Sequence, residues 1–302
     1  MDYLLTHRTT YAYAEPVSVS HHAARLQPVH DGRQVCSDYS LRVHPEPEVR
    51  TTRTDYFGNR VTAFTIRQMH RRMEAVASSR VTVQVITPPV PGLSPAWEEV
   101  ARRFRDPVQP QDVGAYEFCL DSPMIRPSEA LAGYARRCFP PRVPLLVGAA
   151  ALTRAIYEDF EFDPVATEVA TPLEEVLEKQ RGVCQDFAHV ALGCMRSLGL
   201  PARYVSGYLR TIPPEGKPRL EGADASHAWI SVFCPLSGWV DFDPTNNLMP
   251  SDEHITVAVG RDYSDVSPLS GILTGGGEHT VSVSVDVLPL SEAKSPEATA
   301  AG

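Results

Sequence analysis

The spacing of apolar residues changes along this chain, and that change is the strongest constraint on its fold. Over the first hundred residues apolar and polar side chains alternate, as they do in half-buried β-strands. This alternation is found at 9–13, 39–43, 61–66 and 81–85. The sequence Pro-Pro-Val-Pro-Gly at 88–92 then interrupts any regular structure. We therefore predict a β-rich N-terminal domain over residues 1–90.

Beyond this break, apolar residues recur with helical spacing. Ser128 is placed to cap one helix, and a longer amphipathic stretch covers 145–160. The sequence Thr-Pro-Leu-Glu at 171–174 has the form of a capping box, which favours a short helix there. Residues 184–198 carry apolar side chains at helical positions and are followed by glycine and proline stop signals. We predict a helix of about four turns over this last segment.

Strand patterns return after this helix. They cover residues 202–209, 227–234, 238–242 and 280–288. The turn at 235–238 would join the second and third of these strands into a hairpin. The order of elements predicts an α+β fold, in which a helix packs on an antiparallel sheet within a second domain at 91–290. Residues 291–302 are predicted to form a disordered tail.

Composition limits the classes of partner. The chain has 302 residues and a net charge of -9, with 43% hydrophobic and 22% charged residues. These values are typical of a soluble globular protein and provide no broad positive field for nucleic acid or a membrane surface. No long apolar segment opens the chain, so we expect a cytoplasmic protein. Six scattered cysteines lack the spacing of a zinc site or a disulfide framework, so no metal or cofactor is expected.

Cys184 is the residue with the clearest chemical signature. It follows a glycine-containing turn and begins the predicted helix, whose N-terminal N–H groups and dipole favour a thiolate and an oxyanion. His227 begins one strand of the predicted hairpin and Asp243 follows the other, so the two should lie close together. A thiol, a histidine and a carboxylate in this arrangement predict a Cys-His-Asp triad for acyl transfer through a thioester.

Several neighbouring residues compete for these roles. His189 lies on the same helix as Cys184, but about 100° per residue places it roughly 140° around the helix from the thiol. Asp241 and Asp243 share one face of a strand, so the local pattern leaves both open. Cys194 falls on the apolar side of the helix, which favours a packing role. A metal site formed by the three triad residues is an alternative interpretation.

Four blocks of sequence, at 181–189, 198–208, 226–229 and 238–246, occur in an order that resembles the bacterial transglutaminase-like superfamily. The first of these reads Arg-Gly-Val-Cys-Gln-Asp-Phe-Ala-His and the last contains Asp-Pro-Thr. The segments 9–13, 16–17 and 57–59 are similar to the β-rich N-terminal region of the same family. The resemblance extends over most of residues 1–250.

This resemblance implies a papain-like core and a role for each member of the triad. Cys184 would be the nucleophile, His227 the base, and Asp243 of the Asp-Pro-Thr block the orienting carboxylate. Papain-like enzymes usually carry an oxyanion-hole glutamine about six residues before the cysteine, and Glu178 occupies that position here. The backbone N–H of Cys184 is therefore the one oxyanion donor that the resemblance assigns.

The predicted activity is hydrolysis of a peptide or protein amide, as by a cysteine protease or amidase. Transfer of the acyl group to an amine, as in a transglutaminase, is the alternative, and a non-catalytic binding module is a third. Asp186, Tyr208 and Trp229 lie next to the motif residues and are predicted to contact substrate. The sequence allows three alternative roles for the N-terminal domain: shaping the cleft, recruiting a partner or forming a homo-oligomer.

Overall fold

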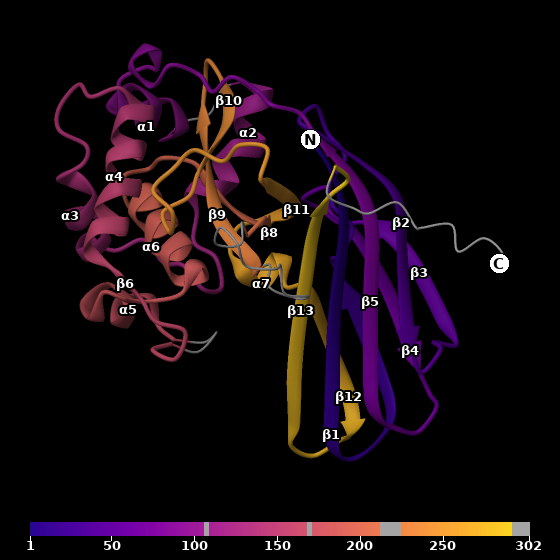
Figure 1. The fold of residues 1–302 in the computed structure, drawn as a ribbon. Coiled ribbons are helices and arrows are strands. Elements are labelled where there is room, and N and C mark those ends of the chain that lie inside the picture. The colour runs from indigo at the N-terminus through magenta and orange to yellow at the C-terminus, as the bar shows by residue number, and fades with distance from the viewer. Residues whose placement is uncertain (106–108, 168–170, 212–224, 292–302) are drawn as a thin grey trace, which may run out of the picture.

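The computed structural model describes residues 1–105, 109–167, 171–211 and 225–291. The chain has two parts, a long sheet and a mixed helical and β part that lies beside one end of it (Figure 1). The predicted tail at 291–302 lies outside the described residues except for residue 291. Among the helices that the structure describes, none is both long enough and apolar enough to cross a membrane.

The long sheet is organised around its first strand, β1 (Asp2–Ala24), which is 23 residues long. Four strands from the N-terminal region join it in the order β2-β5-β1-β4-β3. Their bounds are β2 (Gln34–His44), β3 (Val49–Thr54), β4 (Arg60–Ile66) and β5 (His70–Val83). All four predicted strand segments fall wholly or largely within these strands, and the structure adds β3.

Two strands from the end of the chain complete this sheet. Strands β12 (Leu269–Gly275) and β13 (His279–Pro289) both pair antiparallel with β1, as the adjacent yellow and indigo strands of Figure 1 show. The sequence analysis assigned this segment to the second domain. The difference arises because β1 is long enough to leave a second edge of unpaired backbone groups, and the returning chain satisfies them. Local pattern does not specify such a distant partner.

The second part has a four-stranded antiparallel sheet of order β10-β9-β8-β11, with α6 packed on β8 and β9. Its strands are β8 (Ala202–Leu209), β9 (Ala225–Cys234), β10 (Gly238–Phe242) and β11 (His254–Gly260). Its helices are α1 (Trp97–Arg105), α2 (Pro110–Tyr116), α3 (Glu129–Arg136), α4 (Leu145–Asp159), α5 (Leu173–Lys179), α6 (Cys184–Ser197) and α7 (Tyr263–Val266). Short strands β6 (Glu161–Phe162) and β7 (Arg181–Gly182) pair in parallel just before α6. The predicted α+β class, with a helix on an antiparallel sheet, is confirmed.

Most predicted boundaries in this part agree with the structure. The Ser128 hydroxyl caps α3 by accepting a hydrogen bond from the Leu131 N–H at 3.3 Å. Helix α6 begins at Cys184, as predicted. The short helix α5 begins at Leu173, one residue later than the capping-box pattern placed it. Strand β11 was not predicted, although it completes the sheet next to β8.

A shared hydrophobic cluster joins the two parts. Its members are Tyr3, Leu5, Val81, Val83, Val285 and Val287 from the long sheet and Tyr208, Ile255 and Val257 from the smaller sheet. At its edge the Arg33 guanidinium donates to the Asp241 carboxylate at 2.7 Å. Burial of this much apolar surface fixes the long sheet against the end of β8 and β11.

Gly207 is a position where the sheet has no room for a side chain. It pairs with His227 across β8 and β9, and a Cβ here would lie 2.2 Å from the Ile255 carbonyl oxygen and 2.5 Å from the Trp229 ring. We expect Gly207→Ala to lower the free energy of unfolding by about 1–3 kcal/mol, because backbone must move to admit the methyl group. Denaturant unfolding would measure this loss. The matched control is Gly114→Ala in α2, where no atom lies within 4 Å of the new Cβ and stability should be unchanged or slightly higher.

Candidate active site

Cys184 is the first residue of α6, and its side chain is half-buried. Val183 before it is extended, with φ -112° and ψ 179°, so the chain turns into the helix at the cysteine. The N–H groups of the first helical turn have no intrahelical partners and carry partial positive charge. The thiol therefore lies where a thiolate, or an oxyanion formed on its substrate, would be stabilised.

Asp186 holds the turn that precedes Cys184. Its carboxylate accepts hydrogen bonds from the Val183 N–H at 2.8 Å and from the Thr167 hydroxyl at 2.6 Å. It also lies over Gly182, where an added Cβ would come within 2.5 Å of a carboxylate oxygen. Burial raises the pKa of Asp186, although the hydrogen bonds oppose the shift. The structure thus gives Asp186, predicted to contact substrate, a role in shaping the loop.

His227 and Asp243 are brought together by the β9–β10 hairpin. The His227 Nε2 lies 2.8 Å from the Asp243 Oδ2, and both side chains are buried. Asp241, the competing carboxylate, instead pairs with Arg33, which directly precedes β2 of the long sheet. The ladder between β9 and β10 ends at Phe242, and Asp243, the next residue, is the aspartate that reaches the histidine.

Asp243 is saturated with hydrogen-bond donors. Besides His227, its carboxylate accepts from His254 Nε2 at 3.1 Å, from Asn246 Nδ2 at 2.7 Å and from the Thr245 N–H at 2.9 Å. Burial alone would raise the pKa of Asp243, but the hydrogen bonds from the two histidines outweigh it and hold the pKa well below its usual range. The carboxylate is therefore ionised and fixed in orientation.

The charge on Asp243 controls the protonation of His227. Burial alone would lower the pKa of His227, but hydrogen bonds to Asp243 and to Cys184, with the charges of both, raise it to about 9. Because Nε2 is committed to the carboxylate, the other ring nitrogen, Nδ1, is left for the thiol. The imidazole lies between sulfur and carboxylate, so a proton can pass from the thiol to the ring.

The other predicted site residues lie away from the thiol. His189 is buried on the opposite side of α6, where its Nε2 accepts from the Tyr263 N–H at 3.2 Å. Cys194 is buried in the hydrophobic core. Trp229 is fully buried and packs edge-on against His254, with ring centroids 5.3 Å apart. The Tyr208 hydroxyl is 3.0 Å from the Nδ1 of His7. Tyr208 and Trp229 support the site from behind and do not line the cavity described next.

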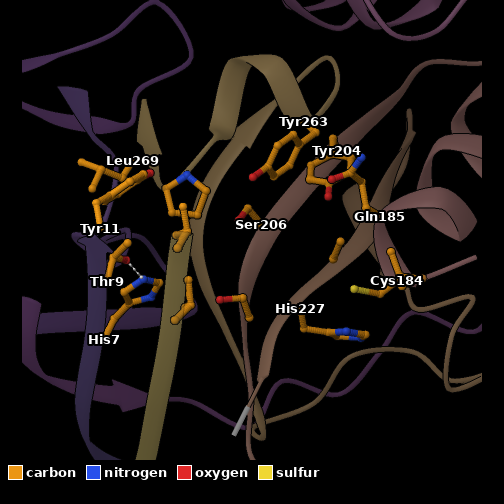
Figure 2. A pocket seen from close by; sticks show the side chains of 16 residues that line it. His7, Thr9, Tyr11, Cys184, Gln185, Tyr204, Ser206, His227, Tyr263 and Leu269 are labelled. Carbon is orange, nitrogen blue, oxygen red and sulfur yellow. Dashed lines mark hydrogen bonds between the residues drawn. The ribbon is translucent and has the colours of Figure 1, made fainter. Parts of the chain in front are cut away.

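A cavity of about 350 Å³ opens in front of Cys184 and His227. Its near side is formed by the second part of the chain, including Gln185, Tyr204 and Tyr263. Its far side is formed by the long sheet (Figure 2), through residues of β1 and β13 and the Pro268–Leu269 segment. The cavity is large enough for one or two amino-acid side chains of a substrate.

Sequence reasoning missed His254, Asn246 and the β1 residues that reach this cavity. Asn246 belongs to the Asp-Pro-Thr-Asn run, so its closeness to Asp243 could have signalled a role. His254 begins a strand whose partner is β8, and nothing in the local pattern identifies the carboxylate it meets. These residues are brought to the site by tertiary pairing alone.

His254 should contribute to activity by holding Asp243. We expect His254→Leu to lower kcat/KM about 10-fold, roughly the value of one charge-assisted hydrogen bond, while the protein stays folded. His254→Gln, whose amide can still donate to the carboxylate, should restore most of the loss. Equal losses in the two variants would show that the ring acts by packing and not by its hydrogen bond. Steady-state kinetics with circular dichroism as a folding check would decide.

His227, Asp243 and His254 offer three ligand atoms within 4.8 Å of one another, a spacing that suits a divalent metal ion. The sequence analysis had considered Cys184 in place of His254. Both imidazoles already bind the same carboxylate oxygen through hydrogen bonds. An ion bound by this group would displace the His227–Asp243 hydrogen bond on which proton transfer depends.

Comparison with known proteins agrees with this geometry. Residues 3–82 match the family model of the bacterial transglutaminase-like N-terminal region, and residues 135–244 match that of the transglutaminase-like superfamily. The chain is 40% identical over 298 residues to an uncharacterized protein of Mycobacterium tuberculosis, which covers 95% of this chain and 93% of that protein. The chain belongs to the transglutaminase-like superfamily.

One solved structure and one further sequence relative are also similar to this chain. A solved structure from Cytophaga hutchinsonii, described as a candidate cysteine protease, superposes with a TM-score of 0.75 over 96% of this chain and 91% of that one, at 22% identity. That likeness concerns the fold. A protein-glutamine gamma-glutamyltransferase of Pseudomonas aeruginosa is 31% identical over 132 residues, which is 40% of this chain and 20% of that protein.

Proposed function

We propose that the protein is a cysteine-dependent amide hydrolase that acts on peptides or proteins through a thioester. The observation that carries this proposal is the His227 imidazole, which is hydrogen-bonded to Asp243 and lines the same cavity as Cys184, the thiol that helps to raise its pKa. Sulfur, imidazole and carboxylate in this order can activate a thiol and then protonate a leaving amine.

The reaction would begin with attack of the Cys184 sulfur on the substrate carbonyl, while His227 holds the thiol proton. The oxyanion that forms would meet the backbone N–H of Cys184 at the start of α6. His227 then gives its proton to the leaving nitrogen, the C–N bond breaks, and a thioester remains on Cys184. Water attacks the thioester, its proton returns to His227, and the acid is released from the restored thiol.

Water is favoured over an amine as the second nucleophile by the charge of the cavity. A lysine side chain that acts as acyl acceptor is a cation before it reacts, and a carboxylate in the cavity would help to recruit it. Of the cavity-lining residues within the described ranges, none is aspartate or glutamate. Transfer to an amine remains the second candidate, because the named Pseudomonas aeruginosa relative is a glutamyltransferase.

Dimethylated casein with a labelled primary amine would separate the two reactions. The proposal expects new amino termini or released ammonia to form faster than the label is incorporated, and Cys184→Ala to stop both. Incorporation of one label for each ammonia released, with no new amino termini, would assign the transferase reaction instead. Equal turnover by the wild type and by Cys184→Ala would contradict a cysteine enzyme of either kind.

A further inference from the structure

The far wall of the cavity is formed by one face of two adjacent strands of the long sheet. In the register of β1 and β13, Thr9 pairs with Val283 and Tyr11 with Val281, so each pair projects from the same face of the sheet. All four residues line the cavity in front of Cys184. Figure 2 shows His7, Thr9 and Tyr11 on the sheet side, across the cavity from Cys184 and His227.

The same face of these strands changes its role along their length. Next to the smaller sheet, Leu5 and its partner Val287 are buried in the cluster that joins the two parts. Farther along, Val281 and Val283 are 48% and 54% exposed, although they continue the same apolar row. Packing between the two parts accounts for the buried end of the row and leaves the exposed end without a structural reason.

The His7 ring and the Thr9 hydroxyl on this wall are already engaged in hydrogen bonds. His7 Nε2 is 2.9 Å from the Thr9 hydroxyl, and His7 Nδ1 is 3.0 Å from the Tyr208 hydroxyl. Burial lowers the pKa of His7 to about 4, so the ring is neutral at pH 7. Of the lining residues that the structure describes, none is Asp, Glu, Lys or Arg. The wall therefore presents a mainly uncharged, apolar surface to a ligand.

We propose that this wall, formed by Thr9, Tyr11, Val281 and Val283, is a specificity subsite that binds an uncharged, apolar side chain of the substrate next to the amide attacked by Cys184. The inference rests on the proposed function and adds the substrate class. It also gives the N-terminal domain a role in selecting substrate. An apolar side chain would cover the exposed valines, whereas a charged one would lose its hydration without gaining a partner.

Three iodoacetamides with the same reactive group test this subsite. One carries an N-benzyl substituent, one an N-carboxymethyl and one an N-(2-aminoethyl) group. The measured quantity is the ratio of Cys184 alkylation rates for benzyl and carboxymethyl reagents, divided by the same ratio for N-acetylcysteine. We expect this normalised ratio to exceed about 10 in the wild type, because only the benzyl group gains apolar contact.

Val283→Asp should reduce the preference for benzyl over aminoethyl about 10-fold, because a carboxylate on the wall attracts the cation. The matched control is Ser282→Asp, which places the same charge on the same edge strand but on its opposite face. Val281→Asp provides a second variant on the wall. An equal effect of Ser282→Asp and Val283→Asp, or no effect of either wall variant, would overturn the inference.

The outcomes distinguish this subsite from the proposed chemistry. Because each ratio uses one reactive group, it can be measured even if Cys184 reacts slowly. Slow alkylation with an apolar preference that Val283→Asp reverses would count against the catalytic thiol and support the wall. Fast alkylation without such a preference would support the catalytic thiol and count against the wall. If a second copy covers the valines, Val283→Asp will change the mass measured by light scattering and leave the ratios unchanged, which would overturn the subsite.

Discussion

Replacing Cys184 with alanine is expected to abolish turnover, with kcat/KM falling by at least about 10⁴-fold. The loss follows because the proposed reaction proceeds through a thioester bonded to its sulfur. The side chain is half-buried at the first residue of α6 and packs only at the margin of the core, so folding should be retained. Thermal unfolding and kinetics on one preparation would measure both properties.

Cys36→Ala is the matched control for this variant. Cys36 is also half-buried, but it lies on β2 in the long sheet and does not line the cavity. We expect its activity to be within about twofold of the wild type. Comparable losses in the two variants would indicate general destabilisation and would remove the support for Cys184 as the nucleophile.

Asp243→Asn is expected to produce the second largest loss, on the order of 10³ to 10⁴-fold in kcat. The amide can occupy the space of the carboxylate but cannot supply its charge, and its NH₂ group competes with the histidine for the role of donor. Asp241→Asn is the control, because Asp241 is engaged with Arg33 and not with His227. It should keep activity close to that of the wild type.

The same variant makes a prediction about pH. In the wild type the pKa of His227 is raised to about 9, so the protonated imidazole persists to about pH 9 and is lost above it. Since the pKa of His227 in the folded protein lies above its ordinary value of 6.5, the proton also stabilises the folded protein. This contribution is full below pH 6.5 and disappears as pH rises through about 9. Asp243→Asn removes the charge that holds the proton.

The basic limb of a pH profile of kcat/KM should therefore move to lower pH in Asp243→Asn. The acid limb of the wild-type profile should not reflect Asp243 itself, because its pKa is held well below the usual range. A basic limb at the same pH in both proteins would show that Asp243 does not set the protonation of His227. Residual activity at each pH is measurable if enzyme concentration is raised.

The residues that could be predicted from sequence are those that local structure brings together. Cys184 was recognisable because a turn and a helix start are encoded by neighbouring residues. His227 and Asp243 are 16 residues apart and are joined by one hairpin, so their meeting required only the pairing of adjacent strands. The same reasoning recovered α6, β8 and β10 with bounds within one residue of those observed.

The features that sequence could not reveal depend on distant pairing. His7 reaches Tyr208 across 201 residues, and β13 pairs with β1 although most of the chain lies between the two strands. For this reason the pairing of β13 with β1, the second histidine on Asp243 and the sheet wall of the cavity were absent from the predictions. Asp186, Tyr208 and Trp229 were close to the motif in sequence, but each turns toward structural partners.

Site-resolved alkylation by iodoacetamide tests the central claim most directly. Cys36 and Cys119 are as half-buried as Cys184, so access alone predicts similar rates for the three thiols. Burial raises the pKa of Cys36 and raises that of Cys119 to about 12, and neither has a histidine partner among the described contacts. At pH 7 we predict that Cys184 is labelled at least about 10-fold faster than Cys36 or Cys119. This difference in rate should be lost in His227→Ala. Equal rates at the three cysteines, unchanged by His227→Ala, would contradict the account.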